Sequence, residues 1–208
     1  MMLRLLSQMC LLLWMLLCSV RLNTITCCHE RDRSLLLMFK QGVVDPSNRL
    51  SSWSSVQDCC LWEGVECDDD RVVRLMLPSS HNSETLRGEI NLSSLLSLDF
   101  LEQLHLDYND FERISMPSIN NSVATHTHLL PNSSKIWVLN LSYNIYLRID
   151  NLHFLLSQLP SLTSVRLSGI RLPSETNWVQ LLASLPLQKL FLNHCYLNSS
   201  VLSRICQF

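Results

Sequence analysis

The sequence is poor in glycine, in lysine and in charge as a whole. Of its 208 residues, 4 are glycine and 3 are lysine, and charged residues make up 16%. The net charge is −2 and there is no run of lysine or arginine. Nucleic acid is therefore excluded as the partner, because phosphate neutralisation requires a basic face. No Gly-rich phosphate loop, G-x-S-x-G, H-E-x-x-H or kinase signature occurs, so we expect no enzyme and no cofactor.

Leucine is present in large excess, at 44 of the 208 residues, and hydrophobic residues make up 47%. This composition excludes a disordered chain, because disorder requires too little hydrophobicity to offset the loss of chain entropy on folding. The length fits one ordinary domain or one short array of repeats. The sequence therefore predicts a folded unit with a leucine-rich interior.

Residues 1–26 predict a secretory signal peptide. Arg4 gives a short positive start, residues 9–20 form an uncharged apolar run, and Arg21 ends it. Such a run is about 18 Å long as a helix, too short for a hydrocarbon core of about 30 Å, so a signal fits better than a membrane span. Cleavage within residues 22–26 would leave 14 basic and 18 acidic side chains, a net charge of −4. The alternative is a retained signal anchor.

Seven cysteines follow the signal, and secretion favours disulfides over reduced thiols or zinc ligands. They are Cys27, Cys28, Cys59, Cys60, Cys67, Cys195 and Cys206. Zinc, with His29 as a further ligand, is disfavoured because the C-x₂₋₄-C spacing is absent and adjacent cysteines fit it poorly. Seven is an odd number, so at least one thiol stays unpaired or pairs with another chain. We expect no metal site.

Five of these cysteines bracket a compact segment. Residues 30–40 predict a short amphipathic helix that starts acidic, ends basic and is stopped by Gly42. Residues 45–48 (DPSN) predict a turn, Trp53 an aromatic anchor and residues 61–67 a strand. The apolar residues of this segment are too few to form a sufficient core alone. The segment therefore needs crosslinks and a neighbour to pack on.

Four motifs in residues 27–70 carry a specific resemblance. They are Cys28-x-Glu30, Leu35-Leu36-x-x-Phe39-Lys40, Leu50-x-x-Trp53 and Cys59-Cys60-x-Trp62-x-Gly64-Val65-x-Cys67. Together they resemble the N-terminal cap of plant extracellular leucine-rich-repeat proteins, which include receptor-like proteins, receptor kinases and polygalacturonase inhibitors. The resemblance implies disulfides between Cys28 and Cys59 and between Cys60 and Cys67. It gives no partner for Cys27, Cys195 or Cys206.

A repeated leucine pattern follows the cap. The template LxxLxLxxN/C matches at residues 101–109 and 136–144, and less fully at 162–170, 187–195 and 72–80. Its central apolar anchors are Leu75, Leu104, Leu139, Val165 and Leu190. We therefore predict that residues 71–208 form about five leucine-rich repeats of an α/β solenoid with a parallel concave sheet. The chain stops at Phe208 in the apolar pattern, without a second cysteine-bearing cap, so we expect a truncated product or a short form that pairs through this end.

Each position of the template has a physical role. Alternating Leu-x-Leu makes a short strand with leucines inward and the x residues outward. The amides of Asn109 and Asn144 should bond backbone groups that are otherwise unpaired inside the arc. Cys195 should fill the same position as a structural thiol. Ile170 cannot make such bonds, so the local backbone should be irregular or satisfied by water.

The segments between the predicted strands also have signatures. Residues 86–90 (LRGEI) resemble the plant-specific L-x-G-x-I element, which forms an extra strand, and residues 152–159 and 178–185 predict short outer helices. Residues 120–134 read as a loop insertion, in which two histidines without a third ligand do not make a metal site. Asp68-Asp69-Asp70 predicts a solvated turn rather than a calcium site, because no distal carboxylate is placed to complete one.

The outward residues should form one contiguous binding surface, because solenoids use the concave sheet for recognition and aromatic and arginine side chains dominate interface energy. The predicted ligand-binding residues are Arg74, Met76, His105, Asp107, Tyr108, Ser142, Tyr143, Arg166, Phe191, Asn193 and His194, with Asn140 and Ser168 on the same face. Five N-x-S/T sequons, at Asn91, Asn120, Asn132, Asn140 and Asn198, predict glycosylation. The alternative is a solvated face, with binding done by repeats outside this chain.

The resemblance implies the N-terminal part of a receptor-like ectodomain that perceives an extracellular peptide, protein or glycan in plant defence or development, with receptor-kinase co-receptors as partners. It implies the secretory pathway and the cell surface, with membrane attachment only through a C-terminal part outside this chain. The alternatives are a secreted inhibitor of a pectin-degrading enzyme and a non-functional truncated product. Anchor steps of 29 and 35 residues count against the compact inhibitor architecture.

Overall fold

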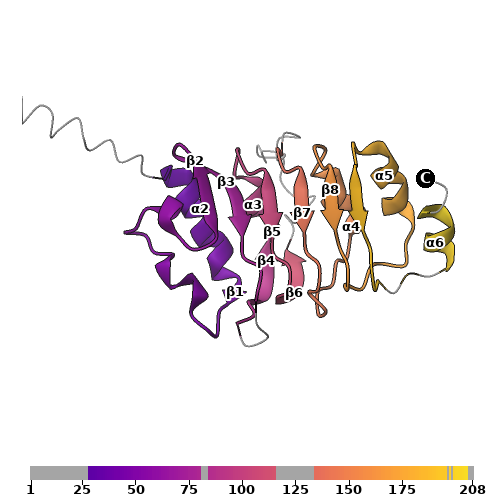
Figure 1. Ribbon diagram of the computed structural model, residues 1–208, viewed down its shortest axis with the longest axis horizontal. Coiled ribbons are helices and arrows are strands. Elements are labelled where there is room, and N and C mark those ends of the chain that lie inside the picture. Colours follow the sequence, from indigo (N-terminus) through magenta and orange to yellow (C-terminus); the bar gives the residue numbers. More distant parts are fainter. Residues whose placement is uncertain (1–27, 81–83, 116–133, 196, 198, 206–208) are drawn as a thin grey trace, which may run out of the picture.

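The computed structural model describes residues 28–80, 84–115, 134–195, 197 and 199–205. The predicted signal peptide, Cys27, Cys206 and most of the predicted insertion lie outside the described residues. The chain winds from one end of an elongated solenoid to the other, so that its strands stand side by side in sequence order (Figure 1). The leucine-rich-repeat solenoid with an N-terminal cap, predicted from the sequence, is confirmed.

The main sheet is built from the predicted repeat strands. Its order is β2 (Val65–Asp68), β3 (Arg71–Met76), β5 (Gln103–His105), β7 (Val138–Asn140), β8 (Ser164–Arg166) and β9 (Lys189–Phe191). The pair β2–β3 is antiparallel and the other pairs are parallel.

The five predicted anchors line up across this sheet. Leu75 pairs with Leu104, Leu104 with Leu139, Leu139 with Val165 and Val165 with Leu190. The first four are at most 1% exposed, whereas Leu190 in the last strand is 36% exposed. The predicted core of stacked apolar rungs is therefore confirmed, because parallel pairing in register places each anchor on the next.

A second, smaller sheet runs beside the first. It contains β1 (Val43–Val44), β4 (Arg87–Asn91) and β6 (Asp110–Ser115), with β1 antiparallel and β6 parallel to β4. The strand β4 confirms the extra strand predicted at residues 86–90. The sequence did not indicate β6, which lacks the glycine of that element. Single bridges continue the row from Arg113 to Arg148 and from Arg148 to Arg171.

Short helices lie in the cap, between strands and after the last strand. They are α2 (Glu30–Gln41), α3 (Leu92–Leu96), α4 (Leu152–Ser157), α5 (Asn177–Ser184) and α6 (Ser199–Ile205), with 3-10 turns η1 (Arg49–Ser52) and η2 (Cys59–Leu61). The helices predicted at residues 30–40, 152–159 and 178–185 are confirmed, with boundaries that differ by at most two residues. Each of the three buries apolar side chains against the core, among them Leu36, Leu155 and Leu182.

The strand predicted at residues 61–67 is wrong in its first half. Leu61 belongs to the 3-10 turn η2, and the strand begins only at Val65. Between them Gly64 has φ +79° and its carbonyl accepts the Met76 N–H at 2.7 Å. A Cβ at this position would collide with the Met76 carbonyl, so glycine is needed where the cap meets the first repeat strand.

Buried asparagine amides join successive repeats. The Asn109 amide donates to the carbonyls of Leu77 and Leu106, and its Oδ1 accepts the Leu86 N–H at 2.9 Å. The Asn144 amide donates to Leu106 and Leu141 at 2.9 Å. Both side chains are at most 1% exposed. The predicted role of these asparagines is confirmed: they pair buried backbone groups that the short strands leave without partners.

The last two repeats replace this asparagine in different ways. Cys195 takes the position as a free, half-buried thiol whose Sγ donates to the Leu167 carbonyl at 3.1 Å. Burial raises the pKa of this thiol, which opposes formation of a thiolate. The irregular backbone expected at Ile170 is not seen. Ile170 is fully buried, its N–H donates to Leu167, and Gly169 turns the chain as Tyr143 does one repeat earlier.

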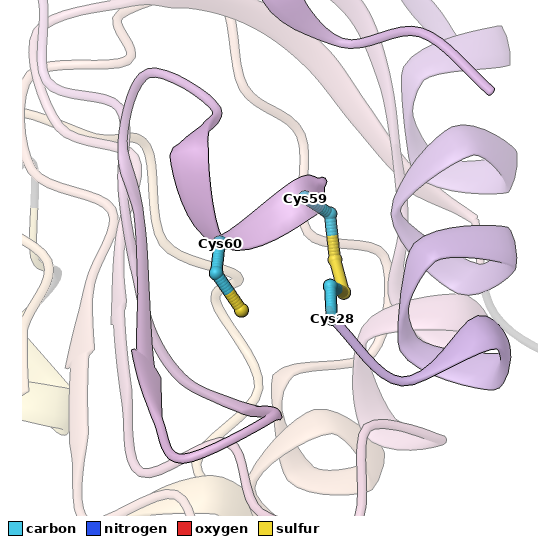
Figure 2. A group of neighbouring side chains, drawn as sticks. All are labelled: Cys28, Cys59 and Cys60. Atoms are coloured by element: carbon cyan, nitrogen blue, oxygen red, sulfur yellow. A yellow bond between two sulfur atoms is a disulfide. The ribbon is translucent and has the colours of Figure 1, made fainter. Parts of the chain in front are cut away.

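The cap is stapled by both disulfides that the resemblance implied. Cys28 is bonded to Cys59, and Cys60 to Cys67. Figure 2 shows the first bond, with Cys60 beside it on η2. Under them Trp53, 2% exposed, stacks on Trp62 with ring centroids 5.2 Å apart and contacts Phe39. The predicted aromatic anchor is confirmed, and it fills an interior that the cap's few aliphatic residues would leave open.

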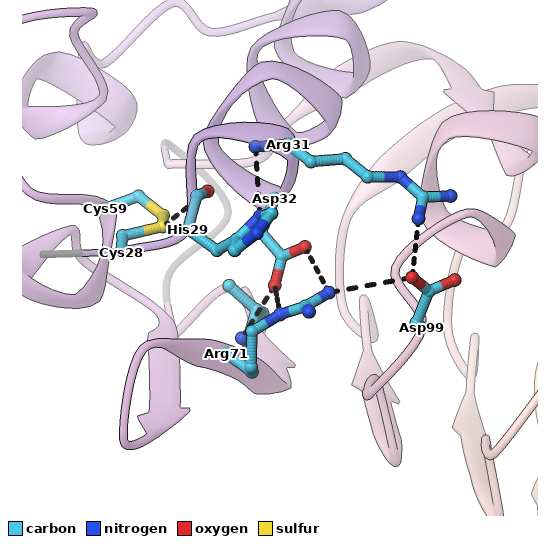
Figure 3. A network of polar contacts seen from close by, with 8 residues as sticks. Cys28, His29, Arg31, Asp32, Cys59, Arg71 and Asp99 are labelled. Carbon is cyan, nitrogen blue, oxygen red and sulfur yellow. Dashed lines mark hydrogen bonds and ion pairs between the residues drawn. A yellow bond between two sulfur atoms is a disulfide. The ribbon is translucent and has the colours of Figure 1, made fainter.

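A buried carboxylate ties the cap helix to the first repeat strand. Asp32 in α2 is fully buried and accepts two hydrogen bonds from the Arg71 guanidinium and one from the Val72 N–H, all between 3.0 and 3.1 Å. Arg71 also reaches Asp99, which binds Arg31 (Figure 3). The hydrogen bonds that the Arg71 guanidinium donates to Asp32 are the main reason that the pKa of Arg71 is raised. These contacts fix the cap on β3.

We expect Asp32→Ala to lower the free energy of unfolding by about 3–5 kcal/mol, because it leaves the buried Val72 N–H without an acceptor and the Arg71 guanidinium with only its longer contact to Asp99. Urea denaturation followed by tryptophan fluorescence measures this. The matched control is Glu30→Ala, which removes an acid from the same helical turn. Its ion pair with Arg33 is exposed, so a change of about 0.5 kcal/mol is expected. Equal effects of the two substitutions would contradict a structural role for Asp32.

Candidate ligand-binding surface

The concave surface consists of the side chains that alternate with the buried anchors along the parallel strands. On each strand the residue before and the residue after the anchor face away from the core, as successive side chains point to opposite faces. These outward pairs are Arg74 and Met76, Gln103 and His105, Val138 and Asn140, Ser164 and Arg166, and Lys189 and Phe191. The paired register sets them in two rows across the sheet.

Most of the predicted ligand-binding residues lie at this surface with some exposure. Tyr108, Phe191, Asn193 and His194 are exposed, and Arg74, Met76, His105, Asp107, Tyr143 and Arg166 are half-buried. Arg74 is already paired with Glu66 at 2.7 Å. The register thus brings residues from five repeats onto one face, as the sequence predicts.

Three of the predicted residues are instead buried within the surface. Asn140, Ser142 and Ser168 are only 4–6% exposed. The Ser142 hydroxyl accepts the Ser168 N–H at 3.2 Å, and the Ser168 hydroxyl accepts the Asn193 N–H at 3.1 Å. These serines therefore bond each repeat to the next and are not free to contact a ligand, which corrects the expectation for Ser142.

A turn with positive φ follows each of four repeat strands. Tyr108, Tyr143, Gly169 and His194 occupy equivalent positions with φ between 57° and 74°. The rings of Tyr108 and Tyr143 stack with centroids 4.6 Å apart. A Cβ on Gly169 would lie 2.8 Å from Cδ1 of Tyr143, so glycine leaves the room that this ring needs. The result is a flat aromatic edge along one side of the concave surface.

His105, Asp107 and Arg166 form the charged centre of the concave surface. Burial lowers the pKa of His105, with the positive charge of Arg166 acting in the same direction and Asp107 opposing it. Burial raises the pKa of Asp107, although its own backbone N–H, His105, Arg166 and a hydrogen bond from Asn140 act against that rise. Arg166 also lies over the Phe191 ring at 5.1 Å. The arginine is thereby held between two repeats, with its charge at the surface.

A cavity of about 230 Å³ opens beside this centre, and we call it the β5–β9 pocket. Its lining residues are Gln103, His105, Trp137, Val138, Thr163, Ser164, Arg166, Gln188 and Lys189. Of these residues the sequence predicted only His105 and Arg166, because the position before the anchor was counted as outward only on the first strand, at Arg74. The same alternation, extended one step backward, would have found Gln103, Ser164 and Lys189.

A larger hollow of about 800 Å³ lies on the second sheet. It is lined by three arginines (Arg87, Arg113 and Arg148), three carboxylates (Asp110, Glu112 and Asp150) and Tyr146. Arg113 pairs with Glu89 at 3.1 Å and Arg87 with Asp110 at 3.7 Å. Its charges are balanced, so this hollow has no net preference for a charged ligand.

Only one group among the described residues has the spacing of a metal site. It consists of Cys28, Cys59 and Cys60, whose sulfur atoms lie within 4.8 Å of one another. All three are in disulfides, which removes the thiolates that a metal would need. Within the part of the chain that the structure describes, no helix is both long and apolar enough to span a bilayer.

Comparison with known proteins agrees with this architecture. Residues 29–68 match the family described as leucine rich repeat N-terminal domain. Over 209 aligned residues the chain is 31% identical to receptor-like protein EIX1 of Solanum lycopersicum, covering 86% of this chain and 20% of that protein. Receptor-like protein EIX2 of the same species is 34% identical over 118 residues, covering 52% and 12%. The chain thus spans about a fifth or less of the length of these relatives.

Among solved structures, a chain of the BIR3–SERK2 complex from Arabidopsis thaliana is similar at a TM-score of 0.61 and 28% identity, covering 84% of this chain and 87% of that one. The BIR2 ectodomain from the same plant gives a TM-score of 0.58 at 22% identity, which bears on the fold alone. The resemblance to the N-terminal part of plant leucine-rich-repeat receptor-like proteins is confirmed.

Glycosylation should distinguish two of the predicted sequons. Asn91 caps α3 through its Oδ1, which accepts from Ser93 and Ser94, and it is half-exposed. Asn140 is 5% exposed and its side chain is bonded to Asp107 and to the Ser142 N–H. We therefore expect the folded protein to carry a glycan at Asn91 and none at Asn140, which revises the expectation for Asn140.

Glycopeptide mass spectrometry of the protein secreted from plant cells measures this difference. Asn91→Gln should lower the mass by one glycan, and Asn140→Gln should leave it unchanged. A glycan at Asn140 in folded protein would contradict the burial of this side chain. The sequons at Asn120, Asn132 and Asn198 lie outside the described residues, and their glycosylation stays a prediction.

The pKa of His105 gives a second prediction. Because its pKa is lowered on folding, neutral His105 contributes to the stability of the folded protein. This contribution is fully present above the unfolded-state pKa of about 6.5 and is lost as the pH falls through the lower folded-state pKa. Asp107→Asn should lower this pKa further, because a favourable charge is removed, whereas Arg166→Gln should raise it. Proton NMR titration of the His105 ring measures all three values. A rise in Asp107→Asn would contradict the described electrostatics.

Proposed function

We propose that the chain is a non-catalytic extracellular recognition module, acting as the N-terminal part of a receptor-like ectodomain in plant defence or development. The similarity to EIX1 and EIX2, both receptor-like proteins, supports this proposal. Export through the secretory pathway belongs to the same proposal, and the two cap disulfides support it, because such bonds persist in oxidising compartments.

The observation that carries the proposal is the concave surface itself. Five parallel strands spaced about 4.8 Å apart set their outward side chains in register over roughly 19 Å. That width fits an extended segment of about five to six residues, at about 3.3–3.6 Å per residue. Arg166, Phe191 and Tyr108 are the residue types that dominate binding energy at interfaces. The strands that carry them are joined by the buried side chains of Asn109, Asn144, Ser142 and Ser168. This pre-organisation reduces the conformational entropy that the surface loses on binding.

A catalytic role has little support at this surface. His105, the imidazole of the β5–β9 pocket, contacts the side-chain amide of Gln103 at 3.4 Å rather than a hydroxyl or thiol. The Cys195 thiol is bonded to a backbone carbonyl, and burial raises its pKa. Neither group is placed as an activated nucleophile would be.

We further propose a receptor-kinase ectodomain as a partner of this module. The structural relative with a TM-score of 0.61 is one chain of a complex between BIR3 and SERK2. A chain of similar fold and length therefore takes part in a complex of two proteins. A leucine-rich-repeat receptor-like kinase, SKM1 of Arabidopsis thaliana, is also 39% identical over 88 residues, covering 41% of this chain and 9% of that protein.

Selection of displayed random peptides on the secreted, immobilised protein tests the proposed function. We expect enriched peptides that lose about tenfold or more in affinity for the double variant Arg166→Ala/Phe191→Ala, the loss typical of interface hot spots. Calorimetry measures the affinities. The matched control is Leu61→Ala, which truncates a side chain that is 80% exposed on the cap, and it should bind as the wild type does.

Two outcomes would count against the proposal. Peptides that bind the double variant as well as the wild type would place binding elsewhere than the concave surface. Inhibition of a purified polygalacturonase by the chain, without peptide enrichment, would favour the inhibitor alternative.

A further inference from the structure

The β5–β9 pocket differs from the other hollows in its charge. Arg166 and Lys189 contribute two positive charges, and no carboxylate among the described residues lines it. The larger hollow on the second sheet, by contrast, has as many acidic as basic side chains. The pocket on the concave surface therefore favours an anionic group.

Two hydrogen-bond donors in this pocket have no acceptor. The Ser164 hydroxyl and Nε of Arg166 are buried atoms without a hydrogen-bond partner among the described residues, and Ser164 is only 6% exposed. Ser142 and Ser168, which are buried to the same degree nearby, both have their hydroxyls bonded. A buried donor left unpaired is costly, so these two groups favour an acceptor from outside the chain, either water or a ligand group.

The position of Arg166 suits it to bind such an acceptor. Its guanidinium is held over the Phe191 ring and near Asp107, which lies outside the pocket lining. Lys189 stands on the next strand, one rung along from Ser164. An acidic group entering the pocket would meet the Arg166 guanidinium and the Lys189 ammonium on two adjacent strands. It would reach the Ser164 O–H and Nε of Arg166 once the side chains that cover these two atoms shift.

We propose that the β5–β9 pocket binds the carboxylate of an acidic side chain in an extended peptide, an assignment that rests on the proposed function and names the chemistry of its ligand. Two primary amides, of Gln103 and Gln188, lie in the same lining. Each can both donate and accept, as the N–H and C=O of a peptide backbone require. The volume of about 230 Å³ is several times the roughly 30 Å³ share of a water molecule, enough for a side-chain carboxylate.

The test uses the full secreted chain, isotope-labelled, and follows the Nε–Hε signals of its arginines by NMR. The probe is N-acetylglutamic acid α-amide, added up to about 50 mM, a range that reaches the weak affinities of small fragments. The Arg166 signal, assigned from its loss in Arg166→Lys, should shift in a saturable way. The glutamine analogue, which lacks the carboxylate, should leave it unchanged. Arg71 is the internal control, because its Nε already donates to Asp32 at 3.0 Å.

Ser164→Ala should weaken binding of the glutamic probe by about three- to tenfold, the effect of one lost hydrogen bond. Because this change only removes an unpaired hydroxyl, folding should be retained, and an unchanged Arg71 signal verifies it. Galacturonic acid is tested in the same way, as a carboxylate carried by a sugar. It should shift the Arg166 signal less than the peptide probe does.

Three results would overturn the assignment. They are no saturable shift at Arg166, an equal shift with the glutamine analogue, and tighter binding of galacturonic acid, which would make the pocket a sugar-acid site. These outcomes are separable from failure of the proposed function. Suppose that displayed peptides bind in a way that depends on Arg166 and Phe191, but that the probe does not shift the Arg166 signal. The proposal of peptide recognition would then stand, and only the proposal of a carboxylate site would fall.

Discussion

The whole structure depends on pairing the backbone groups that very short strands leave unsatisfied. Strands such as Gln103–His105 and Val138–Asn140 have three residues each, too few to hold a solenoid by their own ladder. The ladder continues past them through bonds such as Leu106 N–H to Asn140 and Tyr108 N–H to Ser142. Asn109 and Asn144 then pair the carbonyls that turn inward. Without these side chains the leucine rungs would still attract one another, but burying them would strand polar backbone in the core.

The repeat fold could be predicted because its signals are periodic. Leu104, Leu139 and Val165 recur with a fixed local pattern, and alternation along a strand decides which side chains face inward. The cap disulfides could be predicted only from a resemblance, because spacing alone leaves several pairings open. Strand β6 was missed since its sequence lacks the glycine that marks β4, and its pairing with β4 comes from the stacking of repeats rather than from a local motif.

The candidate site was harder to predict, for a different reason. Alternation identifies outward positions but not their exposure, which depends on side chains from neighbouring repeats. Ser142 was expected at the surface, yet it is buried and bonded to Ser168, 26 positions away. Ser164 was not expected to matter, yet its unpaired hydroxyl distinguishes the pocket. Both facts depend on how adjacent rungs pack, and no single window of sequence contains that information.

The antiparallel hairpin of β2 and β3 has a consequence for how such a protein can change in length. Because β2 runs against the direction of every repeat strand, a further strand of the repeat direction could join its outer edge only by antiparallel pairing. The parallel stack of rungs therefore begins at β3. A change in the number of repeats that keeps this parallel stack would lie beyond β3 and would leave the cap on the same first rung.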